Sequence, residues 1–185
     1  MPYGRTPNLL LAVLLAACAP GHGLPPLPAP SESSYLLGPG DEIRIITVGD
    51  DTLTGEFRVS DQGELALPML GQVHAAGLRP KVLEQAIAQS LVRNGLERNP
   101  SVAIEVIAYR PIFVLGEVNK PGQFPYQPGL TVLGAVALAG GFTYRAVEGY
   151  ASVVRHEPEG TIEGRADRQA VLQPGDVVTV FERRF

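Results

Sequence analysis

The sequence has a single cysteine, no tryptophan and no long uninterrupted hydrophobic run. One cysteine cannot form an internal disulfide, and without a second one a thiolate zinc site is excluded. The three histidines, His22, His74 and His156, lie far apart, with none at metal-ligand spacing from another. We therefore expect neither a metal centre nor a cofactor.

Motifs that mark nucleotide or ester chemistry are also missing. There is no P-loop, no G-x-G-x-x-G and no G-x-S-x-G pattern. The net charge is -4, from 15 basic and 19 acidic residues that are well interspersed. Because the sequence has no basic block, nucleic-acid binding is disfavoured.

Carboxylate pairs are the remaining source of catalytic chemistry, since glycosidases use two of them. The sequence has three candidates: Asp41 with Glu42, Asp50 with Asp51, and Glu157 with Glu159. These pairs lie at predicted turns or strand edges, where carboxylates are normally solvated. We therefore predict a protein that is not an enzyme, and a sugar-cleaving enzyme is the alternative left open.

The composition favours a folded chain of short strands. Hydrophobic residues make up 45% and charged residues 18%, so the chain can bury a core. The 21 glycines and 17 prolines are too many for a helix bundle and predict strands joined by turns.

The first eighteen residues resemble a bacterial lipoprotein signal. Arg5 precedes the apolar run 9–17, which is shorter than the roughly 20 residues that span a bilayer and fits a secretory signal peptide. The run ends in Leu15-Ala16-Ala17-Cys18, which resembles a lipobox. We predict a signal peptide over 1–17 and cleavage between Ala17 and Cys18. We also predict that Cys18 is acylated, with palmitate among its acyl groups. An ordinary signal peptide cut nearby is the alternative.

Acylation would also account for an unpaired thiol in an exported chain. Several acyl chains give stable anchoring, since each buried methylene contributes about 0.8 kcal/mol. Ala19 would be the second mature residue, which favours the outer membrane under the sorting rule of enteric-type bacteria. Residues 18–34 are rich in proline and predict a semi-extended tether without a core-forming pattern.

Residues 35–109 predict a first module of strands and one helix. Alternating apolar residues predict strands over 43–47, 71–78 and 100–109, and a hairpin over 56–68 that turns at 61–63. The segment 79–96 predicts a helix that begins at Pro80 and stops at Gly95. Its apolar face is expected to contain Val82, Leu83, Ala86, Ile87 and Leu91.

Residues 110–185 predict a second module in the order of a β-grasp unit. A hairpin runs from Ile112 through a turn at 119–122 to Tyr126, and strands are predicted over 150–156 and 174–182. A helix over 130–142 is capped by Thr131, ends at two glycines and has an apolar surface of Val132, Val136 and Leu138. The predicted fold is α+β, with two small mixed β-sheet modules, each carrying one helix.

The pattern L-x-P-G-D occurs twice, over 37–41 and 172–176. Proline presets φ, glycine permits a positive φ, and aspartate can accept hydrogen bonds from backbone amides. Each copy predicts a turn that leads into a β-strand, one in each module.

Two sets of segments resemble a known family. Three segments of the first module resemble the polysaccharide export domain of bacterial outer-membrane capsule and exopolysaccharide exporters. They are YLLGPGDEIRI, VSDQGELALPMLGQVHAAGL and NPSVAIEV. One long segment of the second module resembles the soluble-ligand-binding β-grasp (SLBB) domain that follows the export domain in this family. It is FVLGEVNKPGQFPYQPGLTVLGAVALAGGF. The resemblance assigns 35–109 to the export domain and 110–185 to the SLBB domain.

The resemblance implies transport without covalent chemistry. It implies a homo-oligomeric ring, commonly an octamer, that passes capsular or extracellular polysaccharide from the periplasm across the outer membrane. An inner-membrane co-polymerase or chain-length regulator would dock below the ring. A monomeric lipid-anchored glycan-binding module that forms no conduit is the alternative.

Larger family members also carry a C-terminal amphipathic helix that lines the outer-membrane pore, and this sequence ends a few residues after its last predicted strand. A separate outer-membrane β-barrel protein is therefore expected as a further partner. Tyr144 and Arg145 follow the two glycines of the second helix and are predicted to lie on an exposed loop. They are the candidate contacts for polymer or for a neighbouring subunit.

Overall fold

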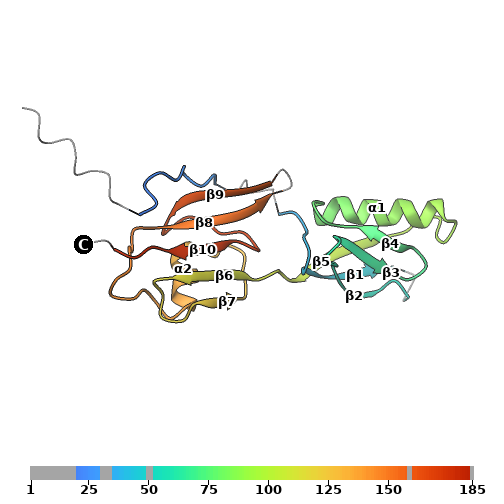
Figure 1. Cartoon of the computed structure of the whole chain (residues 1–185). Helices are drawn as coiled ribbons and strands as arrows, with labels where there is room; N and C mark the ends of the chain where they lie inside the picture. The colour runs from blue at the N-terminus through green and yellow to red at the C-terminus, as the bar shows by residue number, and fades with distance from the viewer. Residues whose placement is uncertain (1–19, 30–34, 49–51, 158–159, 184–185) are drawn as a thin grey trace, which may run out of the picture.

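The computed structural model describes residues 20–29, 35–48, 52–157 and 160–183 and folds them into two modules placed end to end (Figure 1). Each module has its own cluster of buried hydrophobic residues and its own helix. The predicted α+β class, with one helix in each of two modules, is confirmed. No helix among the described residues is both long and apolar enough to span a membrane.

The first module contains two antiparallel sheets and helix α1. Strands β2, β1 and β5 form one sheet in that order, and β3 pairs with β4 in the other. The elements run β1 Glu42–Thr47, β2 Gly55–Arg58, β3 Glu64–Leu67, β4 Gly71–His74, α1 Pro80–Arg93 and β5 Val102–Ala108.

The hairpin predicted over 56–68 is wrong, although its turn forms. The amide of Gly63 donates to the carbonyl of Ser60 and that of Ser60 donates to Glu64, so the chain does reverse there. The strands on either side then pair elsewhere, because β2 joins β1, with Phe57 opposite Ile43, and β3 joins β4. Alternation correctly identified both strands, but it carries no information about which neighbour each strand chooses.

Helix α1 covers the module through a narrower apolar face than predicted. Leu83, Ile87 and Leu91 are buried, at i, i+4 spacing, as expected. Ala86 is only partly buried, and Val82 is 45% exposed, so its assignment to the core face is wrong. Successive helical residues are separated by about 100°, which turns Val82 in the first turn away from the sheet.

The second module is a five-stranded mixed sheet with helix α2 packed on one face. The strand order is β7-β6-β10-β8-β9, and β10 runs parallel to β6 while the other pairs are antiparallel. Val132, Ala135 and Val136 of α2 are buried, whereas Leu138, predicted to be part of its apolar surface, is 46% exposed. The elements run β6 Ile112–Gly116, β7 Gly122–Phe124, α2 Val132–Leu138, β8 Tyr150–Glu157, β9 Gly160–Asp167 and β10 Val177–Val180.

Strand β9 was not predicted from the sequence. Its eight residues, GTIEGRAD, contain little apolar alternation, and Ala166 is its one buried hydrophobic side chain. The strand forms because all eight residues pair with β8, from Gly160 opposite Glu157 to Asp167 opposite Tyr150. Tertiary pairing here outweighs a weak local signal.

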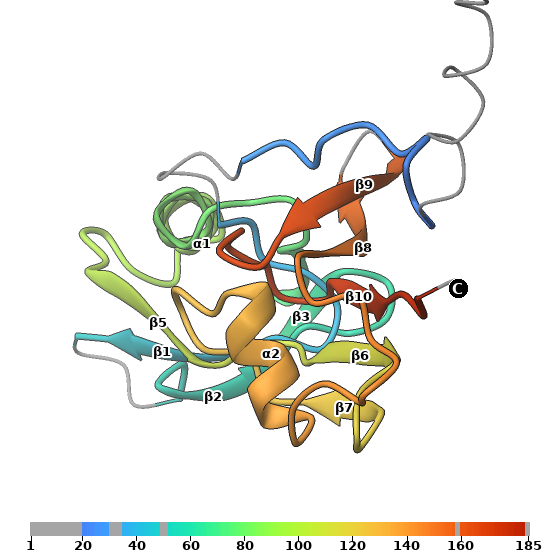
Figure 2. The ribbon, with the colours of Figure 1, turned by 90° about the vertical axis from the view of Figure 1, so that its left-hand side faces the viewer.

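Residues 20–29, part of the predicted tether, pack along the second module rather than standing free (Figure 2). Pro26 bridges Arg165 in parallel, and the amide of Leu27 donates to the carbonyl of Arg165 at 2.8 Å. The segment therefore extends the sheet beyond β9. The fit requires Gly164, because a Cβ at that position would lie 2.7 Å from the Cα of Leu27.

Candidate functional site

Asp41, which ends the first Pro-Gly-Asp turn, is fully buried and fully bonded. Its carboxylate accepts hydrogen bonds from the amide of Gly38 at 2.7 Å and from the hydroxyl of Tyr35. Arg110 donates to the same carboxylate from its backbone amide, at 2.8 Å, and from its guanidinium, at 2.9 Å. The prediction that this carboxylate is solvated is wrong.

Asp176 repeats this arrangement in the second turn. Its carboxylate accepts from the amide of Gln173 at 2.8 Å, as Asp41 does from Gly38 three residues before it. Arg155 forms two hydrogen bonds with it, at 3.0 and 2.7 Å, and the two side chains are 2% and 1% exposed. Each L-x-P-G-D turn therefore ends in a buried carboxylate that is bonded to an arginine distant in sequence. Asp41 is bonded to Arg110 of the linker, and Asp176 to Arg155 of β8.

The two turns meet around Arg110, in the linker between the modules. A Cβ at Gly38 would lie 2.4 Å from the guanidinium of Arg110, and one at Gly175 would lie 3.0 Å from Nε of the same side chain. Gly175 has a φ of 85°, a conformation that favours glycine. The repeated motif thus supplies both walls of the joint between the modules.

Three tyrosines continue this joint across the boundary. The ring of Tyr109 lies 5.1 Å from that of Tyr35 and 5.5 Å from that of Tyr126, both edge to face. Burial, followed by the hydrogen bond to Asp41, raises the pKa of Tyr35 well above its ordinary value. Burial also raises the pKa of Tyr109 and of Tyr126.

These shifts predict a loss of stability at alkaline pH. A tyrosine in the unfolded chain releases its proton near about pH 10, whereas folded Tyr35 keeps it. The folded state then binds more protons than the unfolded state, so the free energy of unfolding falls as the pH rises above that value. In Tyr35→Phe the urea midpoint, measured from about pH 9 to about pH 11, should fall less steeply than in the native chain. Tyr144→Phe is the control, and parallel curves for native chain and Tyr35→Phe would contradict the prediction.

The predicted loop at Tyr144 is exposed and held in place. Tyr144 is 88% exposed, and Arg145 forms an ion pair with Glu182. Thr143 is bonded twice to Glu117, through its backbone amide and its hydroxyl. The exposure predicted for this loop is thus found, and whether it contacts polymer or another subunit stays a prediction.

The other predicted site residues do not gather into one site. Ala17 and Cys18 lie outside the described residues, as do Asp50, Asp51 and Glu159. Glu42 forms an exposed ion pair with Arg58, and Glu157 is exposed at the end of β8. Within the described part of the chain, the carboxylates of the three acidic pairs are therefore either committed to arginine or isolated on the surface.

Arg110 and Arg155, which complete the two buried sites, were not predicted from the sequence. Arg155 carried a usable signal, since it interrupts the apolar strand YASVVRH at a position that faces the core. A buried cation needs a buried anion, and the aspartate of a Pro-Gly-Asp turn could have been paired with it. Arg110 carried no comparable signal, because it lies in the linker between the modules.

Two known families match the chain, one after the other along the sequence. Residues 29–107 match the family described as Polysaccharide biosynthesis/export protein, and residues 111–166 match the SLBB domain. The first match covers most of the first module, and the second runs from the linker into β9. The two matches are separated by residues 108–110, which include Arg110.

Three curated proteins are similar to the chain over much of its length. The exopolysaccharide production protein ExoF of Rhizobium meliloti is 34% identical over 71% of this chain and 32% of its own length. The polysialic acid transport protein KpsD of Escherichia coli is 30% identical over 58% and 19%. The EPS I polysaccharide export outer membrane protein EpsA of Ralstonia solanacearum is 28% identical over 69% and 36%. The chain spans well under half the length of each of these relatives.

Proposed function

Because this chain belongs to the polysaccharide biosynthesis/export family, with an export domain followed by an SLBB domain, we propose that it exports capsular or extracellular polysaccharide. The observation that carries the proposal is the order of the two domain matches, which together run from residue 29 to residue 166. In this proposal the export domain spans residues 35–109 and the SLBB domain spans residues 110–185.

The proposed transport involves no covalent chemistry. Asp41 and Asp176 are the buried carboxylates of the described chain, and each already accepts hydrogen bonds from an arginine side chain and from a backbone amide. A general acid or base needs a carboxylate that can exchange its proton with a substrate, and these two are enclosed. Their role in the proposal is structural, because Asp41 binds Arg110 at the joint between the modules and Asp176 binds Arg155 within the second module.

The transporting unit is a ring of identical subunits, an octamer in the form that the family resemblance suggests. A ring is built from two different faces of each subunit. The sheet of the second module offers one such face, because Phe113 and Leu115 are 39% and 43% exposed on the side of β6 opposite buried Ile112 and Val114. An inner-membrane polysaccharide co-polymerase is the expected partner on the periplasmic side.

Acylated Cys18 anchors this subunit to the periplasmic face of the outer membrane. The hydroxyl of Tyr150 donates to the carbonyl of Pro20 at 2.8 Å, two residues after Cys18, at the start of β8. That strand begins at the end of the second module remote from the first (Figure 1). The anchor would thus hold the SLBB domain at the membrane and direct the export domain toward the periplasm.

Deletion of the gene tests the proposal directly. Cells lacking the protein should retain polysaccharide internally and lose it from the surface, measured by staining intact and permeabilised cells. The native gene should restore surface polymer, and a Cys18→Ser copy should restore less because its product is not anchored. Normal surface polysaccharide in the deletion strain would refute an export role.

The size of the detergent-solubilised acylated protein separates the ring from its alternative. A particle of many subunits, measured by light scattering, supports a conduit. A particle that stays monomeric at high concentration supports the lipid-anchored glycan-binding module instead.

A further inference from the structure

Tyr144 is the most exposed large hydrophobic residue in the described part of the chain, at 88%. An aromatic ring left in water forgoes the stabilisation that burial gives. Tyrosine combines an apolar ring with a polar hydroxyl, a pairing that suits the boundary between water and the headgroups of a membrane.

The loop that carries Tyr144 is fixed on both sides. Thr143 is held by Glu117, and Arg145 by its ion pair with Glu182. The amide of Arg183 donates to the carbonyl of Arg145 at 2.8 Å, and its guanidinium donates to the carbonyl of Ala146 at 2.8 Å. A side chain presented by such a loop loses little conformational entropy when a partner covers it.

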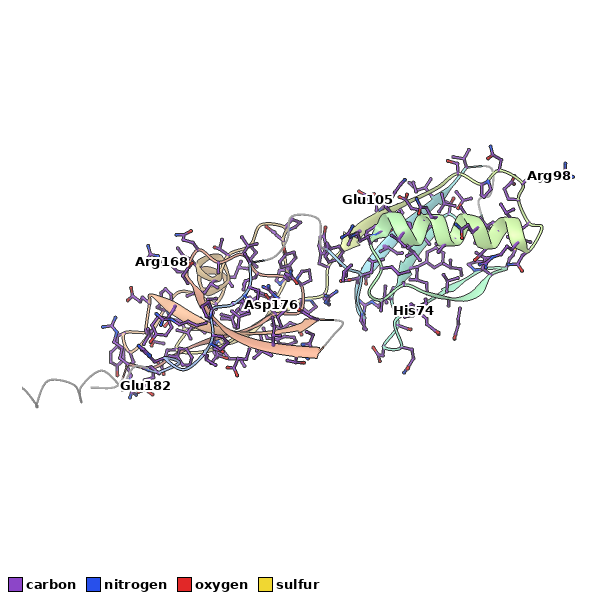
Figure 3. All side chains as sticks on the ribbon, turned by 90° about the horizontal axis from the view of Figure 1, so that it is seen from above. His74, Arg98, Glu105, Arg168, Asp176 and Glu182 are labelled. Carbon is purple, nitrogen blue, oxygen red and sulfur yellow. The ribbon has the colours of Figure 1, made fainter. Side chains whose placement is uncertain are left out.

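The same end of the module carries the start of the N-terminal segment. Ala146 bridges Glu182, and Phe181 lies so close to Gly21 that a Cβ there would be 2.6 Å from its ring. Glu182 is labelled in Figure 3 at the extremity of the second module remote from the first. Cys18 precedes Pro20 by two residues, a reach of at most about 7 Å.

The charges around the loop are largely balanced. Arg145 is paired with Glu182 and Arg183 with Glu148, so the described residues at this end form no polybasic patch that would bind anionic lipid by itself. A single ring also binds a membrane weakly without a lipid chain to hold it there. The contact therefore depends on the acyl anchor.

We propose that the Tyr144 loop rests in the headgroup layer of the membrane that holds the N-terminus, so that the subunit stands on a second point beside its acyl chains. The inference depends on acylation of Cys18, as set out under Proposed function. Two points of contact fix the tilt of the subunit, whereas an anchor alone would let it swing.

The absence of tryptophan makes a direct test available. Tyr144→Trp places the only indole of the chain on the loop, and Val92→Trp places it on the exposed side of α1 in the first module as a matched control. Each acylated full-length variant is reconstituted on vesicles of phosphatidylethanolamine and phosphatidylglycerol, with or without brominated acyl chains. Trp emission and its quenching by bromine are then measured.

The expected result is blue-shifted emission from the Tyr144→Trp variant, most of it quenched by brominated lipid, with neither effect in Val92→Trp. Emission from both variants that resembles solvent-exposed indole, on protein that sediments with the vesicles, overturns the inference and leaves the anchor intact. A blue shift without quenching also overturns it, because the ring is then covered by protein. Protein that fails to sediment removes the anchor, and this inference with it.

Discussion

Unfolding of the Asp176→Ala variant should require about 3–5 kcal/mol less free energy than unfolding of the native chain. The substitution leaves the guanidinium of Arg155, 2% exposed, without its carboxylate partner. Its remaining acceptors, the carbonyls of Pro28 and Val171, lie at 3.4 Å and carry no full charge. Urea denaturation followed by circular dichroism measures the loss.

Two further variants separate the causes of this loss. Asp176→Asn keeps a carbonyl oxygen for the amide of Gln173 but removes the charge, so most of the destabilisation should remain. Glu182→Ala breaks an ion pair of the same module whose side chains are 48% and 45% exposed, and should cost no more than about 1 kcal/mol. Equal small effects for Asp176→Ala and Glu182→Ala would show that the buried pair does not support the fold.

The Arg110→Met variant should lose about 3 kcal/mol of stability and should uncouple the two modules. Asp41, fully buried, keeps the hydroxyl of Tyr35 and two amides but loses its only cation. The guanidinium packs against Gly38 and Gly175 and also donates to the carbonyl of Leu36 at 3.4 Å, and methionine replaces neither its charge nor its hydrogen bonds. The first module should melt at a lower temperature than the second, so calorimetry should resolve two transitions.

Arg168→Met is the control for this prediction, because Arg168 is exposed and its side chain forms no ion pair among the described residues. It should leave a single transition at the native temperature. A single transition in Arg110→Met, shifted no further than in Arg168→Met, would mean that the modules are coupled by the tyrosine contacts alone.

The local structure was largely predictable from sequence. Both helices, their starts at Pro80 and at the Thr131 cap, and the hairpin of β6 and β7 follow from periodicity and turn residues. These features depend on residues a few positions apart, where sequence spacing and spatial neighbourhood coincide. The strand predicted over 174–182 is likewise found, as β10.

The long-range features were not predictable by these means. Pairing of β2 with β1 and of β9 with β8 depends on which sheet edge is free, and docking of residues 20–29 depends on a glycine more than 130 positions further along the chain. The burial of Asp41 was missed for the same reason, because the charge that permits it, on Arg110, lies 69 residues away.

The docked N-terminal segment makes the first module an insertion within the second. Pro20 and Tyr150 are hydrogen-bonded across 130 positions, and Pro28 and Arg155 across 127. Contacts so distant in sequence form slowly. As the chain is synthesised, residues 35–109 can fold as soon as they emerge, while residues 20–29 wait for their docking surface until β8 and β9 are made. The second module, whose residues 20–29 are synthesised before the first module, is therefore completed after it.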